Sequence, residues 1–437
     1  MTTQEQALQN IIQSAQRLGV ELNQADALQW LAAMTAAQHS EIVIDERSGI
    51  FGHRISMLDF SDKDLAHFRE IGKLVEFRDI PGKVETALAL SGSAAQSKIQ
   101  TYPGDADFFE RVNIFAPTRE EACSILGELM REKAISTLNG PTHQLIQVRM
   151  GNYPFDLLRG NDLMSAGSPI AWTPEEVEAG SMTGTTPAGD AAEVTWEQAA
   201  QHPGWCKLDW VVADPVREQL VNASNMLDVT WEAPDGTITP LDGYLDSYFQ
   251  EVYLDAESIP VFSKLVKHVS GDALDDYVDQ LENEVKKYVS MHPNYGKAAK
   301  RLYNIFRLTG RYAEAVYLRE LFDEPTTMLY QAGALIRTID ESFQPGSDIA
   351  PKTIARQTDK LILGVIETLE GEKEAEIVRM LLRLRDLISE DAKRGELSPQ
   401  ASATRAEVIN VVNNFFYDKL TGVPTIRKYI QELQETE

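Results

Sequence analysis

Two strand-forming segments on either side of a glycine constrain the fold of this chain more than any other feature. VETALALS, 84–91, and DADFFERVNIF, 105–115, are rich in the β-branched, aromatic and other apolar residues that favour strands. The stretch GSAAQSKIQTYPG, 92–104, separates them. The sequence therefore predicts two successive strands of one sheet with a tight turn at Gly92, because glycine allows the backbone to turn sharply.

The remaining pattern divides the chain into three parts. Residues 1–40 form two helices with apolar positions at helical spacing, and 41–242 alternate between strand and helix patterns. Within them, 165–204 are rich in Gly, Thr, Pro and Ala, which indicates a loop-rich insertion with one short helix after Thr173. From 243 to 437 the strand signals stop and amphipathic segments follow one another, so we expect an all-helical domain. The predicted class is α+β, with a small mixed sheet and flanking helices before that domain.

Composition limits the function. The 41 Lys and Arg residues against 67 Asp and Glu residues give a net charge of -26, which repels polyanions, so no long-range affinity for nucleic acid is expected. No apolar stretch reaches the length of a membrane span, and the N-terminus lacks a secretory apolar region. We expect a cytoplasmic protein without a membrane partner. The two cysteines, Cys123 and Cys206, cannot build a disulfide framework.

Acidic residues follow the glycine turn at a spacing that suits metal chemistry. Asp105 and Asp107 lie two apart on the second strand, so both carboxylates face the same side of the sheet. Carboxylate oxygens are preferred ligands of Mg²⁺, and Mn²⁺ accepts them too. Gly92 and Ser93 stand where a turn, a hydroxyl and backbone amides could hold the terminal phosphates of a nucleotide. Metal and phosphate binding would then meet at one turn.

This arrangement resembles the polymerase-β-like nucleotidyltransferase superfamily, whose signature is Gly-Ser, a short helix and then Asp-x-Asp on the next strand. The superfamily includes poly(A) polymerases, CCA-adding enzymes, oligoadenylate synthases and bacterial cyclic-oligonucleotide synthases. The resemblance covers residues 84–114. Gly-Ser also occurs at 167, 180 and 346, but only the copy at Gly92 has strands on both sides. The resemblance implies a nucleotidyltransferase core and a two-metal mechanism. The competing interpretation is that Gly92 only turns the chain and that Asp105 and Asp107 are solvent-facing strand residues.

Enzymes of this superfamily use a third carboxylate from a neighbouring strand, and two positions compete for that role. Asp209, in KLDWVVADP, precedes apolar residues and a proline, as in the family's third-acid strand. Asp156, in YPFDLLRG, has a similar neighbourhood and lies closer in the sequence. We favour Asp209 and keep Asp156 as the alternative. The predicted metal ligands are thus Asp105, Asp107 and Asp209.

A basic stretch stands out in this acidic chain. KAAKRLYNIFRLTGR, 297–311, contains five basic residues and no acid. At about 100° per residue, the basic residues gather on one side of a helix, opposite Ala299, Leu302 and Phe306. In the resembling enzymes, lysines of the helical domain contact the triphosphate, which implies that role for Lys297 and Lys300. An ordinary solvated face is the competing interpretation.

The function predicted from these features is transfer of a nucleotidyl group from an NTP, with ATP as the expected donor, to a hydroxyl, releasing pyrophosphate. The acceptor would be a nucleotide, a short RNA end or a protein. The alternative is a catalytically inactive nucleotidyltransferase-like module that binds nucleotide or a protein partner, since fold analogy alone does not establish catalysis.

Overall fold

The fold is described from a computed structural model of the whole chain. It describes residues 3–38, 41–45, 50–55, 62–77, 79–92, 95, 106–138, 144–150, 157–158, 181–185, 191–195, 206–213, 220–243, 249–254, 267–268, 273–291, 293–322, 324–337, 339–343, 351–368 and 374–435.

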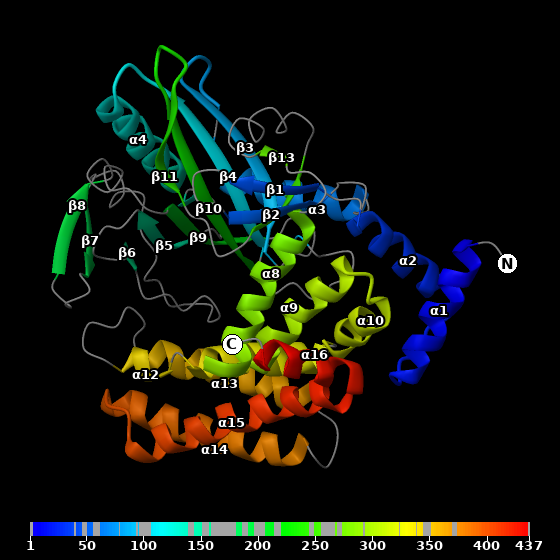
Figure 1. The fold of residues 1–437 in the computed structure, drawn as a ribbon. Coiled ribbons are helices and arrows are strands. Elements are labelled where there is room, and N and C mark those ends of the chain that lie inside the picture. The colour runs from blue at the N-terminus through cyan, green and yellow to red at the C-terminus, as the bar shows by residue number, and fades with distance from the viewer. Residues whose placement is uncertain are drawn as a thin grey trace.

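A mixed sheet of eleven strands forms the upper layer in Figure 1. Its strands are β1 (Glu41–Asp45), β2 (Ile50–Ile55), β3 (Val84–Ser91), β4 (Ala106–Phe115), β5 (Gln144–Met150), β6 (Leu157–Leu158), β9 (Cys206–Ala213), β10 (Leu220–Glu232), β11 (Ile238–Gly243), β12 (Phe249–Tyr253) and β13 (Lys267–His268). Their order is β13-β1-β2-β12-β3-β4-β10-β9-β5-β6, with β11 beside β10. The pairs β2–β12 and β4–β10 are parallel, and the other neighbours are antiparallel.

The α+β class is confirmed, although the sheet is larger than the small one expected. The expectation that strands stop near residue 243 is wrong. β12 lies between β2 and β3, and β13 pairs with β1. Both strands come after residue 243, so the sheet is completed by a segment from the part of the chain that was expected to be all-helical. The domain boundaries at residues 40 and 242 stay a prediction.

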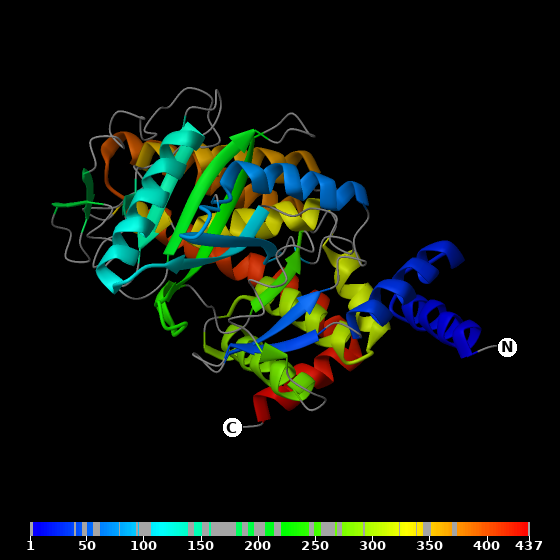
Figure 2. The same cartoon turned by 90° about the horizontal axis from the view of Figure 1, so that it is seen from above.

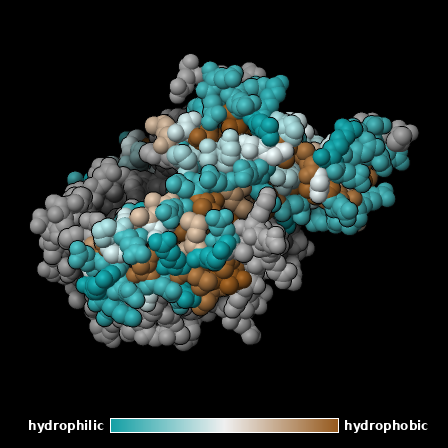
Figure 3. Space-filling view, turned by 90° about the horizontal axis from the view of Figure 1, so that it is seen from below, coloured by the Kyte–Doolittle hydropathy of each residue, from teal (hydrophilic) through white to brown (hydrophobic). Residues whose placement is uncertain are grey.

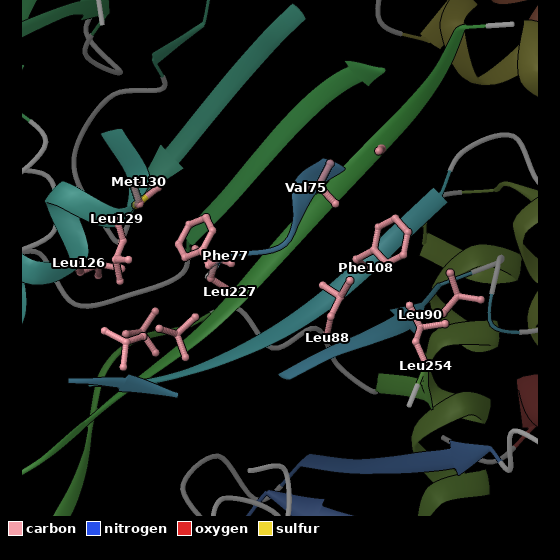
Figure 4. Packing of buried hydrophobic residues seen from close by; sticks show 14 of the residues in the cluster. Val75, Phe77, Leu88, Leu90, Phe108, Leu126, Leu129, Met130, Leu227 and Leu254 are labelled. Atoms are coloured by element: carbon pink, nitrogen blue, oxygen red, sulfur yellow. The ribbon is translucent and has the colours of Figure 1, made fainter. Parts of the chain in front are cut away.

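Two helices, α3 (Asp62–Val75) and α4 (Arg119–Leu138), cover one face of the sheet, as Figure 2 shows. Strand residues alternate between faces, and the apolar residues of β3, β4 and β10 that face these helices form one core cluster with them. Figure 4 shows Leu88, Leu90, Phe108 and Leu227 in this cluster. Thr118 caps α4, since its Oγ1 accepts a hydrogen bond from the backbone N–H of Glu121 at 3.2 Å.

Below the sheet, the C-terminal part of the chain forms a layer of helices (Figure 1). They are α8 (Ala273–Lys286), a π-helical turn over Lys287–Met291, α9 (Tyr295–Leu308), α10 (Tyr312–Leu321), α11 (Glu324–Arg337), α12 (Ile339–Ser342), α13 (Pro351–Thr368), α14 (Glu374–Arg394), α15 (Pro399–Gly422) and α16 (Pro424–Glu435). Two apolar clusters hold this layer together. The face that Figure 3 shows is largely hydrophilic, with smaller brown areas between teal ones.

The two N-terminal helices, α1 (Thr3–Arg17) and α2 (Gln24–Gln38), form a hairpin that reaches out to one side (Figures 1 and 2). Leu8, Ile11 and Leu31 pack with Tyr312 of α10. Trp30 belongs to the apolar cluster of α8, α9 and α16. The hairpin therefore packs on the C-terminal helical layer.

The predicted insertion contains regular structure. β7 (Ser181–Thr185) and β8 (Ala191–Thr195) form a separate two-stranded antiparallel sheet. The short helix expected after Thr173 lies outside the described residues. Among the helices that are described, none has the length and apolar character needed to cross a bilayer.

Candidate functional site

The turn after β3 lies directly against the acidic strand β4. Gly92 has a φ of +58°, a left-handed conformation that favours glycine. A Cβ atom at this position would stand 2.5 Å from Oδ2 of Asp107. Asp107 itself is half-buried at the start of β4. Glycine is therefore favoured here for two reasons, the backbone conformation and the close approach of the carboxylate.

Asp107 lies on the face of the sheet opposite α3 and α4. Its neighbours Ala106 and Phe108 belong to the core under those helices, whereas Phe109 belongs to a separate cluster with Tyr253. Because successive strand residues face opposite sides, Asp107 shares the face of Phe109. The carboxylate is thus kept out of the main apolar core.

Asp107 and Asp209 occupy the same level of the sheet. Asp107 on β4 pairs with Ser224 on β10, and Ser224 pairs with Asp209 on β9. Two strand spacings, about 10 Å, separate the two acidic positions. The strand expected around Asp209 is confirmed as β9, and it lies two places from the Asp-x-Asp strand β4, with β10 between them.

Several predicted site residues fall outside what the structure describes. Ser93 and Asp105 are in this group, although each is the chain neighbour of a described residue, Gly92 or Ala106. Asp156 lies outside it too, and for Asp209 only the backbone position is described. Within the described residues, no group of three or more His, Cys, Asp or Glu side chains could hold a metal ion. The choice between Asp209 and Asp156 stays a prediction.

Further along the Asp107 face, β4 and β10 carry a buried polar ladder that the sequence did not reveal. Arg111 Nη1 donates to Asp228 Oδ2 at 2.7 Å, and these two side chains are 0% and 2% exposed. The Arg111 guanidinium also lies over the ring of Phe109, 5.0 Å from its centroid. One step on, Thr230 Oγ1 donates to Asn113 Oδ1 at 2.8 Å. Charged residues within an otherwise apolar strand such as DFFERVNIF are the sequence signal from which a buried polar contact could have been predicted.

The opposite face of β4 carries a buried carboxyl group. Glu110 accepts hydrogen bonds from the backbone N–H of Phe77 at 2.7 Å and from Nδ2 of Asn225 at 2.5 Å. Burial raises the pKa of Glu110 to about 7, and the two hydrogen bonds and the charge of Lys133 oppose that rise. Burial in turn lowers the pKa of Lys133. Glu110 thereby ties the end of α3 to β4 and β10.

The basic stretch lies on α9, and its residues contact aromatic rings. Lys297 Nζ is 5.2 Å from the ring centroid of Tyr288. Lys300 Nζ is 4.4 Å from that of Tyr330. Both lysines are half-buried, and whether they bind phosphate stays a prediction.

The expectation of one basic face opposite one apolar face is wrong for the end of this helix. Arg307 is only 3% exposed and packs over Tyr303. Arg311 stacks on Phe306 at 4.1 Å and pairs with Glu314 at 3.1 Å. The reason is that other helices and the N-terminal hairpin surround α9 and leave it no broad solvent face.

Comparisons with known proteins give a weak likeness of fold. No family model matches this chain, and no curated protein matches it. Among solved structures, it is similar to the Mg662 protein of M. chilensis in complex with GTP, with a TM-score of 0.41 and 10% identity over 85% of this chain and 97% of that one. A structure described as a new nucleotidyl transferase encoded by a Megaviridae ORFan gene gives a TM-score of 0.37 and 12% identity over 85% and 95% of the two chains.

Proposed function

We propose that this chain is a metal-dependent nucleotidyltransferase that moves a nucleotidyl group from an NTP to a hydroxyl and releases pyrophosphate. The observation that carries the proposal is the contact between the turn at Gly92 and the carboxylate of Asp107. Phosphate transfer needs a phosphate-binding turn and a metal-binding acid at one place, and the turn that follows β3 lies against Asp107 on the adjacent strand β4.

The donor set suits a hard divalent cation. Asp105, Asp107 and Asp209 would hold Mg²⁺ or Mn²⁺, both of which accept carboxylate oxygen ligands. Positions 107 and 209 lie at the same level of the sheet, two strands apart, so their carboxylates would hold the metal together. A bound metal would lower the pKa of the attacking hydroxyl and neutralise the charge on the leaving pyrophosphate.

The protein's own residues have separate tasks in this scheme. The turn at Gly92 and Ser93 seats the donor phosphates with its hydroxyl and backbone amides. Asp209 helps to accept the proton of the acceptor hydroxyl, which then attacks the α-phosphorus of the NTP as the bond to pyrophosphate breaks. Lys297 and Lys300 contact the triphosphate as point charges. ATP is the proposed donor, and the acceptor is a nucleotide, a short RNA end or a protein.

Each of the four labelled NTPs, incubated with Mg²⁺ or Mn²⁺ and with nucleotide, short RNA or protein as acceptor, tests the proposal. We expect pyrophosphate release to require metal, and Asp107→Asn and Asp105→Asn to lower the rate by about 10³-fold, which corresponds to roughly 4 kcal/mol of transition-state stabilisation. Asp386→Asn is the matched control, because it removes the same charge from an exposed pair on α14.

Metal-independent turnover, or near-normal pyrophosphate release by the Asp105→Asn/Asp107→Asn double variant, would contradict the catalytic assignment. Nucleotide binding without any turnover in wild-type protein would favour the inactive nucleotide-binding module instead.

A further inference from the structure

The register between β4 and β10 is set without help from a short turn. These parallel neighbours are separated in the chain by α4 and by β5 to β9. In a hairpin the turn fixes the register, whereas here the side chains have to do so. The register matters to the candidate site, because it places Asp107 opposite Ser224 and so level with Asp209.

The apolar pattern excludes only some of the wrong registers. On the face toward α3 and α4, Phe108 and Val112 of β4 lie beside the buried Leu227 and Val229 of β10. A shift by one residue would turn these side chains to the other face of the sheet, which the core forbids. A shift by two residues keeps every apolar residue on its own face. Burial of apolar side chains alone therefore gives only a small free-energy penalty for a shift by two residues.

The charged pair on the other face opposes those remaining shifts. Arg111 and Asp228 are direct register partners, both are buried, and 2.7 Å separates Nη1 from Oδ2. A shift by two residues would place Arg111 opposite Met226 or Thr230 and move the carboxylate away by about 6 to 7 Å. Two buried charges would then lose their mutual contact, which is among the more costly defects in a protein interior.

We propose that Arg111 and Asp228 form a register clamp that holds Asp107 level with position 209. They are positioning residues, since they act on the metal site through the alignment of β4 and β10 and touch no reacting atom. The inference rests on the proposed function, because it assigns the clamp to the metal ligands of that site.

The test measures Mn²⁺ affinity by electron paramagnetic resonance, together with pyrophosphate release and the unfolding temperature. In Arg111→Met/Asp228→Leu, apolar side chains of comparable size replace the pair, a change that buried pairs often tolerate. We expect Mn²⁺ to bind about 10- to 100-fold more weakly, the range seen when groups that orient metal ligands are lost. The exchanged pair Arg111→Asp/Asp228→Arg should recover Mn²⁺ affinity to within about twofold of wild type.

Val112→Ala is the matched control. It creates a cavity on the same strand but on the helix-covered face, so it should lower the unfolding temperature and leave Mn²⁺ affinity unchanged. A wild-type Mn²⁺ affinity in Arg111→Met/Asp228→Leu would overturn the clamp. So would a folded exchanged pair that binds Mn²⁺ no better than the apolar pair, because a clamp depends on pairing and not on which strand carries which charge.

Asp107→Asn separates the two hypotheses. If it leaves both Mn²⁺ binding and pyrophosphate release intact, the proposed function fails. If it abolishes both while the apolar pair behaves like wild type, only the clamp fails.

Discussion

Replacement of Gly92 by alanine tests the site at its closest contact. The new Cβ would lie 2.5 Å from Asp107 Oδ2, so the carboxylate has to move by roughly 0.9 to 1.5 Å to reach an ordinary van der Waals separation. A displacement near 1 Å at a reacting centre can cost about 100-fold in rate. The φ of +58° adds strain of about 1 to 2 kcal/mol for a residue with a Cβ. We therefore expect kcat/KM to fall by roughly 10- to 100-fold.

Gly82 is the matched control for this change. Its φ of +71° imposes similar strain on alanine, but nothing lies within 4 Å of the new Cβ. Gly82→Ala and Gly92→Ala should therefore lose a similar free energy of unfolding, about 1 to 2 kcal/mol in urea titrations, whereas only Gly92→Ala should weaken Mn²⁺ binding and slow pyrophosphate release. Equal losses of activity in the two variants, or full activity in Gly92→Ala, would refute the reasoning.

Three further predictions concern the third carboxylate, the two lysines of α9 and the buried carboxyl group of Glu110. Asp209→Ala should abolish pyrophosphate release at saturating metal while Asp156→Ala is milder, and the reverse order would move the third ligand to the earlier strand. Replacing Lys297 and Lys300 by alanine should raise the Kd for NTP by at least about tenfold, because charge-assisted bonds to phosphate are among the stronger ones, and unchanged NTP titrations would remove the lysines from the site. The pKa of Glu110 is about 7 in the folded protein and 4.5 ordinarily, so folding favours the protonated carboxyl group. Its contribution to the free energy of unfolding, about 3 kcal/mol, is fully present below pH 4.5 and is lost as the pH rises through 7. Glu110→Gln should flatten urea-unfolding stability between pH 5 and 8, and a pH dependence identical to wild type would contradict this.

Local patterns predicted much of the fold. The hairpin β10–β11 has a local sequence signal in its alternating residues and in the turn at Gly236, whose φ is +83°. The two strands predicted on either side of Gly92 are confirmed. In each case the residues that specify the element are close together in the sequence, so the signal is visible there.

Features that depend on distant partners could not be predicted in the same way. β12, with the sequence FQEVY, has strand-forming residues but is too short to be recognised from its own pattern, and it is held between β2 and β3 by pairing across the chain. Arg111 and Asp228 are 117 residues apart, so the sequence around either residue does not predict its partner. On α9, the spacing of the basic residues correctly placed a helix, but it carries no information about the aromatic rings of Tyr288 and Tyr330 that contact the lysines.

The packing of the N-terminal hairpin on α10 has a consequence for synthesis. The apolar residues of α1 and α2 that contact Tyr312 leave the ribosome well before α10, because roughly 270 more residues have to follow them before Tyr312 itself is made. At about 5 to 20 residues per second, this leaves the hairpin without its partner for roughly 15 to 50 s. During that time Leu8, Ile11 and Leu31 are exposed as a small apolar surface on a nascent chain. The apolar residues of the hairpin thus need protection from non-native contacts on the nascent chain until α10 has been made.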